Sequence, residues 1–223
     1  MFCLNSNHDK ILRSLYSMNS LKYIENDLLP PIHTYNLCTI FFLDIVNFSK
    51  KCKLLTSEKV AEWMTNFHNI IQKYIKKYYI QKIETKGDNY LCLSGTNHID
   101  NDLVINQVTR MVNFSNKIIK KLNNLDNTNV RIGIHCGSTT ISYIGHNAPL
   151  KTVYGNDVNI AARMEQSSKT NLIHLTKKAA EIYANENNLL LDNSKCYVTN
   201  IKDIINMETF FYDAYIKDFI SIK

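Results

Sequence analysis

The sequence predicts an α+β protein with a ferredoxin-like βαββαβ core, a mostly antiparallel sheet that carries helices on one face. Short apolar runs rich in β-branched and aromatic residues alternate with longer segments of helical periodicity. Their order is strand, helix, strand, strand, helix, strand, with further strands toward the C-terminus. The 223 residues are 45% hydrophobic and 21% charged, which permits a sizeable core and excludes disordered and collagen-like chains.

The first third of the chain predicts a lead-in, a strand and a long helix. Residues 1–29 show loosely helical spacing and end at two consecutive prolines. The run CTIFFLDIV, residues 38–46, predicts a buried strand. A helix is expected from Thr56, a residue suited to an N-cap, to about Tyr79, because its apolar residues fall on one face.

The middle of the chain predicts two hairpins around a helix. The runs 81–85 and 89–95 are joined through the sequence KGD, a hairpin signal. Residues 102–124 have helical periodicity, and residues 130–145 predict a second hairpin that turns around Gly137. The remaining elements expected are a strand at 151–154, helices at 156–166 and 176–186, and strands at 171–175, 195–201 and 208–215.

Charge and cysteine content narrow the functional classes. The net charge of +6 suits an anionic ligand, but the lysine clusters lack stacking aromatic residues, so we expect solvated helix faces and no nucleic-acid partner. The six cysteines include no C-x-x-C pair, which favours a reducing, cytoplasmic location. The N-terminus lacks a signal-peptide pattern and the longest apolar run contains Asp44, so we expect no membrane contact encoded in this chain.

Four segments carry the candidate chemistry: FFLDIVNFS (41–49), KIETKGDNYLCLSG (82–95), RIGIHCGSTTISYIG (131–145) and TVYGNDVNIAARME (152–165). In this order and spacing they resemble the class III nucleotidyl cyclase catalytic domain, of guanylyl cyclase type, from about Leu28 to Tyr215. The resemblance implies a helical lead-in or dimerisation segment at 1–31 and a catalytic domain at 32–223.

Asp44 and Asp88 are the candidate metal ligands. Each is expected at the end of a strand, and two carboxylates brought together there can bridge two Mg²⁺ or Mn²⁺ ions, which prefer oxygen ligands. The resemblance implies the same two aspartates, with the backbone carbonyl of Ile45. Backbone N–H groups of Asn47, Phe48 and Ser49 would face the triphosphate. The family usually has glycine at Asn47, and asparagine tolerates unusual backbone angles.

Glu84 is the candidate base-reading residue. A carboxylate can accept from the N1–H and N2 amino groups of guanine, whereas the N1 lone pair of adenine would repel it. In the family, Glu here accompanies guanylyl cyclases and Lys adenylyl cyclases. The partner position is Thr152, whose hydroxyl can donate or accept and so does not decide between GTP and ATP. We do not expect Lys82 or Lys86 to enter this pocket.

Asn159 and Arg163 lie four residues apart and so share a helix face. The resemblance implies that Asn159 orients the ribose and Arg163 stabilises charge at the α-phosphate. The sequence departs from the family pattern at two positions. Ile204 occupies the position of a triphosphate-binding lysine, for which Lys202 could substitute. Ser138 replaces an arginine found in some family members. His135 is expected to be structural.

The expected function is a guanylyl cyclase that converts GTP to cyclic GMP and pyrophosphate by attack of the ribose 3′-hydroxyl on the α-phosphate. The partner would be a second copy or another cyclase domain, in the cytoplasm or at the cytoplasmic face of a membrane as part of a larger protein. An adenylyl cyclase and a catalytically impaired regulatory half of a heterodimer remain as alternatives, and an RNA-binding ferredoxin-like domain is disfavoured.

Overall fold

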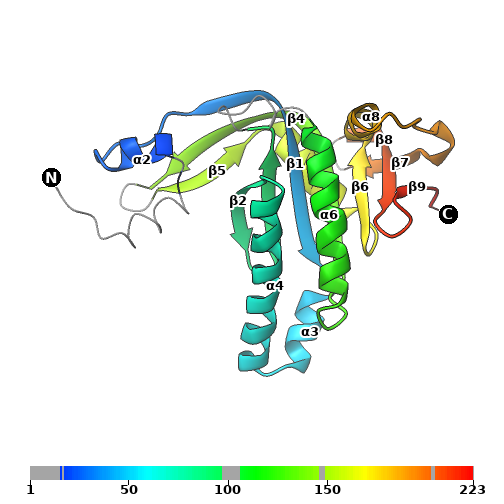
Figure 1. Cartoon of the computed structure of the whole chain (residues 1–223), viewed down its shortest axis with the longest axis horizontal. Coiled ribbons are helices and arrows are strands. Elements are labelled where there is room, and N and C mark those ends of the chain that lie inside the picture. The colour runs from blue at the N-terminus through cyan, green and yellow to red at the C-terminus, as the bar shows by residue number, and fades with distance from the viewer. Residues whose placement is uncertain (1–15, 17, 97–105, 146–148, 202–203, 223) are drawn as a thin grey trace. The chain divides into compact units, whose positions relative to one another are not determined.

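The computed structural model of the chain describes residue 16 and residues 18–96, 106–145, 149–201 and 204–222 (Figure 1). The chain divides into two compact units, one made of residues 1–34 and 140–154 and the other of residues 35–139 and 155–223. Each unit is described by itself. Among the described residues, no helix combines the length and the apolar character needed to cross a membrane.

The sheet has the strand order β2-β3-β1-β4-β6-β8-β7, with β5 paired to β4 and β9 to β8. Most neighbouring strands run antiparallel, whereas β4 and β6 run parallel. The elements β1, α4, β2, β3, α6 and β4 follow the predicted βαββαβ order, so the predicted fold class is confirmed. The strands are β1 (His33–Ile45), β2 (Gln81–Lys86), β3 (Asn89–Ser94), β4 (Val130–Ile144), β5 (Leu150–Tyr154), β6 (Leu172–Thr176), β7 (Tyr197–Ile201), β8 (Ile204–Asp213) and β9 (Asp218–Ile220).

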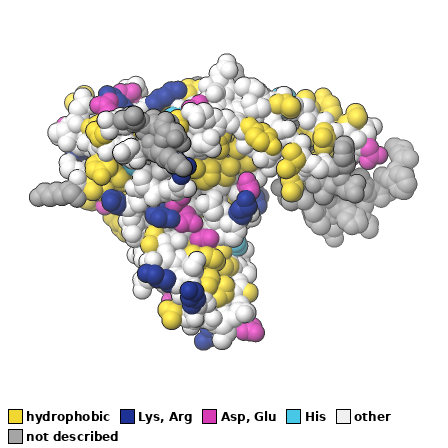
Figure 2. Space-filling model, turned by 180° about the vertical axis from the view of Figure 1, so that it is seen from behind, with side chains coloured by type: hydrophobic (Ala, Val, Ile, Leu, Met, Phe, Trp, Pro, Cys, Tyr) yellow, Lys and Arg dark blue, Asp and Glu magenta, His cyan; other side chains and the backbone are white. Residues whose placement is uncertain are grey.

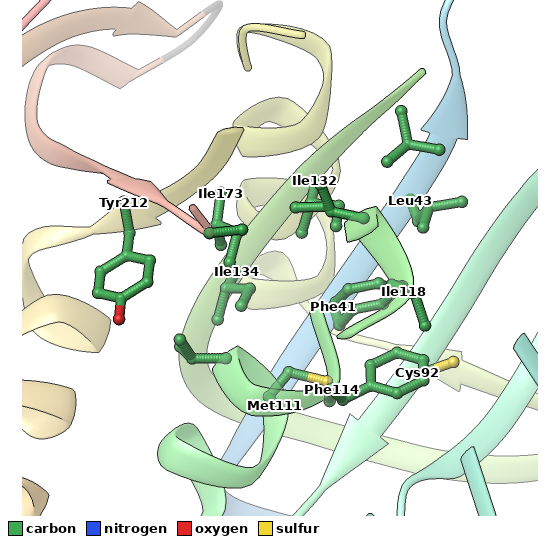
Figure 3. Packing of buried hydrophobic residues seen from close by; sticks show 14 of the residues in the cluster. Phe41, Leu43, Cys92, Met111, Phe114, Ile118, Ile132, Ile134, Ile173 and Tyr212 are labelled. Carbon is green, nitrogen blue, oxygen red and sulfur yellow. The ribbon is translucent and has the colours of Figure 1, made fainter. Parts of the chain in front are cut away.

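Helices α4 and α6 lie side by side over one face of the sheet in the larger unit (Figure 1). Thr56 caps α4, and the buried residues Trp63, Phe67, Ile71 and Tyr74 recur at helical spacing on its inner face. Between the helices and the sheet, the ring of Phe41 meets that of Phe114 edge-on at 5.4 Å (Figure 3). The helices of this unit are α3 (Phe48–Leu54), α4 (Ser57–Lys77), α6 (Gln107–Asn123), α7 (Asn156–Gln166), α8 (Lys177–Glu186) and the 3₁₀ turn η1 (Asn193–Lys195).

The smaller unit contains α2 (Met18–Ile24), the hairpin of β4 with β5, and the first residues of β1. Within it, the hydroxyl groups of Ser20 and Tyr143 lie 2.8 Å apart. The hydroxyl of Tyr16 donates to the carbonyl of Pro149 at 2.9 Å. The predicted boundary at residue 31 stays a prediction.

The predicted hairpin around Gly137 is wrong. Strand β4 runs without a turn from Val130 to Ile144, and the hairpin is instead the pairing of β4 with β5. Gly137 is required for another reason: a Cβ there would lie 2.2 Å from Cγ of Asp157. Gly137 therefore marks the place where α7 packs closely against β4, and it does not mark a turn. The helix α3 and the short strand β9 were also not predicted.

Asparagine occupies most of the left-handed backbone positions outside glycine. Among the described residues, ten non-glycine residues have positive φ, and six of them are asparagines: Asn47, Asn106, Asn127, Asn171, Asn188 and Asn206. Asparagine visits this region at lower cost than most residues. Asn47, at the position where the family usually has glycine, lies in this region with φ 59° and ψ 29°.

Candidate active site

Asp44 and Asp88 are brought together where β1 ends and the β2–β3 turn begins. The register of β1 with β3 pairs Leu43 with Tyr90, which places the two carboxyl groups at one edge. The backbone N–H of Ile45 donates to Oδ2 of Asp88 at 3.2 Å. Burial, and then the negative charge of Asp44, raise the pKa of Asp88 to about 6. Two carboxylates that crowd each other in this way gain from a shared cation.

The counter-charge in this structure comes from Arg131 on β4. Its Nη2 lies 2.6 Å from Oδ2 of Asp44, and its Nε lies 3.1 Å from Oε1 of Glu165 on α7. The second contact is an ion pair without hydrogen-bond geometry. The Glu165 side chain is only 5% exposed. Burial, and then the charge of Asp44, raise its pKa to about 7 although Arg131 opposes the shift.

The donor set fits divalent cations that prefer oxygen. The carboxylates of Asp44 and Asp88, with the adjacent carbonyl of Ile45, supply acceptor-only oxygens, and mutual repulsion leaves the pair short of positive charge. In the described part of the chain, no group of three or more His, Cys, Asp or Glu side chains is arranged to hold a metal ion.

The segment after Asp44 turns into α3. Asn47 adopts the left-handed conformation and stands at the N-cap of α3 without a side-chain capping bond. The ring of Phe48 stacks on Trp63 at a centroid distance of 5.8 Å, which anchors the turn to α4. Ser49 is exposed. These three residues thus form the turn that follows β1 and the start of α3.

A hollow of about 150 Å³ lies on the three strands next to the carboxylates, lined by Phe42, Glu84, Lys86, Asn89 and Leu91. Leu91 of β3 pairs with Phe42 of β1 on one side and with Glu84 of β2 on the other. These side chains therefore share one face of the sheet. Phe41, the neighbour of Phe42, points to the α6 side, so the hollow opens on the face away from α4 and α6, the side seen in Figure 2.

Lys86 corrects the expectation that no lysine enters this pocket. It lines the hollow, and its Nζ is 3.9 Å from Oε1 of Glu84. The two residues are separated by one position in β2, so their side chains lie on the same face. Lys82, as expected, is not among the lining residues.

Helix α7 is seated on β4 by two glycines and one carboxylate. A Cβ on Gly133 would lie 2.1 Å from the backbone nitrogen of Glu165, so α7 contacts the strand directly. The Asp157 carboxylate accepts from the backbone N–H of Ser138 at 2.6 Å and lies 3.1 Å from Nε2 of His135. Burial alone would raise the pKa of Asp157, but these hydrogen bonds outweigh it and lower the pKa. Ile132 and Ile134 point into the core, so α7 covers the opposite face of β4.

Asn159 and Arg163 lie on the exposed side of α7. Arg163 donates from Nη1 to Oε1 of Gln166 at 2.7 Å, a contact within the same helix. His135 is buried and bridges Asp157 to Thr176, which matches the structural role expected for it. Burial lowers its pKa, and the neighbouring Asp157 opposes the shift.

Three predicted positions fall elsewhere. Thr152 lies on β5 in the smaller unit, paired with Ser142 of β4. Lys202 lies outside the described residues. Ile204 begins β8.

Comparison with known families gives a match over residues 31–213 to the model described as the adenylate and guanylate cyclase catalytic domain. The match covers most of the chain. The chain belongs to this family. The predicted resemblance to the class III cyclase catalytic domain is therefore confirmed, as is the prediction of a purine nucleotide cyclase domain.

The cyclase domain has curated relatives in nematodes. The receptor-type guanylate cyclase gcy-14 of Caenorhabditis elegans is 33% identical over 153 residues, which are 67% of this chain and 14% of the relative. The soluble guanylate cyclase gcy-31 of the same species is 28% identical over 181 residues, 79% of this chain and 26% of the relative. The chain thus spans only a small part of the curated relatives it matches.

Solved cyclase structures share the fold. The catalytic core of a rhodopsin-guanylyl cyclase with converted specificity, in complex with ATPαS, has a TM-score of 0.69 at 25% identity and covers 81% of this chain and 96% of that one. The guanylate cyclase domain of RhGC from Catenaria anguillulae, in complex with GTP, has a TM-score of 0.69 at 24% identity, covering 86% and 100%. The adenylyl cyclase CyaB from P. aeruginosa also has a TM-score of 0.69, at 16% identity, covering 86% and 97%. The fold therefore does not distinguish a guanylyl cyclase from an adenylyl cyclase.

Sequence reasoning about the cyclase domain missed Arg131 and Glu165. Both stand inside quoted motifs, but their roles depend on a contact between β4, β1 and α7 that no local pattern shows. The one available signal was chemical: Glu165 follows a run of apolar helix positions, and a buried carboxylate requires a cation nearby.

Proposed function

We propose that this cyclase domain converts GTP to 3′,5′-cyclic GMP and pyrophosphate. The observation that carries the proposal is that one chain presents both a close pair of carboxylates, Asp44 and Asp88, and a hollow lined by the carboxylate of Glu84, so two such domains can supply a complete site. The hollow is smaller than a typical drug-sized ligand pocket, so it suits the base alone. The guanylate cyclase relatives support the choice of GTP.

The proposed mechanism divides the work among three groups of residues. Asp44, Asp88 and the carbonyl of Ile45 would hold two Mg²⁺ or Mn²⁺ ions, which supply charge stabilisation at the triphosphate and activate the 3′-hydroxyl for in-line attack. Arg131 holds Asp44 in place from the side of β4. The backbone N–H groups of Asn47, Phe48 and Ser49 would donate to phosphate oxygens.

The remaining groups read the base and stabilise the transition state. Glu84 accepts from the N1–H and N2 amino groups of guanine. Thr152, whose hydroxyl can donate or accept, is the proposed second contact to the base. Asn159 would orient the ribose and Arg163 would donate to the charge that develops on the α-phosphate. Lys202 is the proposed cation for the leaving pyrophosphate.

We propose that two cyclase domains complete each site, one supplying the metal aspartates and the other the base-reading and transition-state residues. The two domains would be two copies of this chain or this chain and another domain. Asn159 and Arg163 are exposed on α7, and Arg163 contacts only its own helix among the hydrogen bonds described. An exposed face of this kind is available to a partner. The proposed location is the cytoplasm, or the cytoplasmic face of a membrane if the domain is part of a larger protein.

The deciding experiment assays the purified chain with Mg²⁺ or Mn²⁺ and either GTP or ATP. We expect cyclic GMP as the main product and a loss of about 10²–10³ in turnover for Asp44→Ala. Asp218→Ala, an exposed aspartate of β9, is the control and should turn over normally. Cyclic AMP without cyclic GMP would reverse the choice of base, and unchanged turnover in Asp44→Ala would contradict the metal assignment.

A mixing experiment tests the shared site. Asp44→Ala and Arg163→Ala should each be inactive alone, and an equal mixture should recover about a quarter of the activity, because half of the dimers carry one intact site. An inactive mixture would contradict a site shared between two copies of this chain. A chain that makes no product but activates a second cyclase domain would be the regulatory half instead.

A further inference from the structure

The hollow on β1, β2 and β3 holds a polar arrangement beyond the single carboxylate on which the proposed function rests. Glu84 and Lys86 stand on one face of β2, and Asn89 of β3 is paired with Lys86 across the turn. Gly87, with φ 61°, makes this tight connection possible. An acceptor and a donor of opposite charge therefore open into the same 150 Å³ space.

The contact between the two charges leaves the lysine available to a ligand. Nζ of Lys86 is 3.9 Å from Oε1 of Glu84, with side-chain exposures of 87% and 49%. An exposed pair at this distance stabilises the fold very little, because water screens it. The Arg131 ion pair is much closer, with 2.6 Å between Nη2 and Oδ2 of Asp44. The Lys86 ammonium carries three donors, and the described contacts give it one loose partner.

The edge of guanine is complementary to this pair. Guanine presents the O6 acceptor next to the N1–H and N2 amino donors, so a base that donates to Glu84 carries an acceptor beside the same carboxylate. Lysine is a common donor to guanine O6. Adenine offers an amino donor in place of O6 and an acceptor at N1, so it makes fewer bonds to the pair.

We propose that Lys86 is a second base-reading residue, which donates to O6 of guanine while Glu84 accepts from N1–H and the N2 amino group. This inference rests on the proposed function and adds a specificity-determining residue within the larger unit. It makes Lys86 responsible for the O6 edge and Glu84 for the N2 edge of the same base.

Base analogues that change one edge at a time test this division. Binding is measured by displacement of a fluorescent, ribose-modified GTP analogue from the full chain with Mg²⁺. In 6-thio-GTP only the O6 acceptor is weakened, and in ITP only the N2 amino group is missing. The wild type should bind 6-thio-GTP about tenfold more weakly than GTP, as expected for losing a hydrogen bond to a charged donor. ITP should be penalised to a similar degree.

The variants should remove these penalties selectively. Lys86→Met should weaken GTP binding and abolish the further penalty for 6-thio-GTP while keeping that for ITP. Glu84→Gln should reduce the penalty for ITP and keep that for 6-thio-GTP. Lys82→Met, an exposed lysine of β2 outside the hollow, is the matched control and should behave as the wild type.

The two levels of the hypothesis fail differently. If Lys86→Met keeps the full 6-thio-GTP penalty, Lys86 does not read O6, although the cyclase function stands. If no purine nucleotide displaces the probe from the wild type, the proposed function itself fails. If Lys82→Met matches Lys86→Met, the effect is general positive charge and the base-reading role is overturned.

Discussion

The carboxylate cluster, made of Asp44, Glu165 and Arg131, and the hollow on β1, β2 and β3 differ in how their charges are paired. In the cluster, Arg131 bridges Asp44 and Glu165 at 2.6 Å and 3.1 Å, and Glu165 is buried. In the hollow, Glu84 and Lys86 are 3.9 Å apart and largely exposed. Asp44 and Glu165 have a counter-charge within the protein, Arg131, whereas Glu84 and Lys86 pair only loosely and remain accessible to a ligand.

This difference in burial predicts which substitutions change the stability of the fold and which change ligand binding. A buried carboxylate that loses its cation has no water to replace it, so the folded state bears the cost. An exposed carboxylate that loses its partner is solvated, so only ligand binding changes. We therefore expect the loss of Arg131 or of Glu165 to change the free energy of unfolding, and substitutions in the hollow to change ligand affinity.

The largest expected effect is that of Arg131→Met. It leaves Glu165 buried without a counter-ion and should lower the free energy of unfolding by about 3 kcal/mol. Chemical denaturation of the metal-free protein measures it. Lys177→Met is the matched control, because Lys177 also sits 2.6 Å from a carboxylate, Glu208, but at the surface. Equal losses in the two variants would mean that burial does not distinguish them.

The pH dependence of Glu165→Gln sharpens the same contrast. The pKa of Glu165 is about 7 in the folded protein against an ordinary 4.5, so between these values the folded state binds more protons than the unfolded state. This group therefore costs stability progressively as pH rises from 4.5 to 7.

Glu165→Gln removes that cost. Relative to the wild type, its unfolding free energy should rise by up to about 3 kcal/mol across this window, at 1.36 kcal/mol per unit. Urea titrations at pH 5 and pH 8 without metal measure the difference. For Glu208→Gln, at an exposed position on β8, the unfolding free energy should change with pH in the same way as in the wild type. Parallel curves for Glu165→Gln as well would contradict the raised pKa.

The smallest expected change in stability belongs to Glu84→Gln. Its unfolding free energy should stay within about 0.5 kcal/mol of the wild type, because the carboxylate is half exposed and its ion pair is weak. Its GTP dissociation constant should nevertheless rise about tenfold through the lost charged acceptor. A stability loss as large as that of Arg131→Met would show that the hollow is part of the structural core.

Much of this fold could be predicted because local patterns agree with tertiary packing. Helix α7 begins and ends at the predicted residues 156 and 166. The prediction of a turn at Gly137 was wrong because glycine is also used where another element packs closely against the backbone. Here that neighbour is Asp157 of α7. A single sequence does not separate these two uses of glycine.

The candidate site was predictable where one segment carries the chemistry. Asp44, Glu84 and Asp88 each stand inside a short motif, so the sequence alone could propose them as candidates. The ion pairs of Arg131 and the entry of Lys86 into the hollow depend on strand register and on the seating of α7. Those contacts join residues far apart in the chain or fix which face a side chain occupies, and periodicity does not encode them.

The asparagines in left-handed turns have a consequence for the unfolded chain. A glycine at such a turn samples many more backbone states before folding and so loses more conformational entropy, a difference worth about 0.4–1 kcal/mol per site. By using Asn47, Asn106 and Asn171 instead, this glycine-poor chain restricts its disordered ensemble at those turns. The loop after Asp44 therefore loses less conformational entropy on folding than it would with glycine at residue 47.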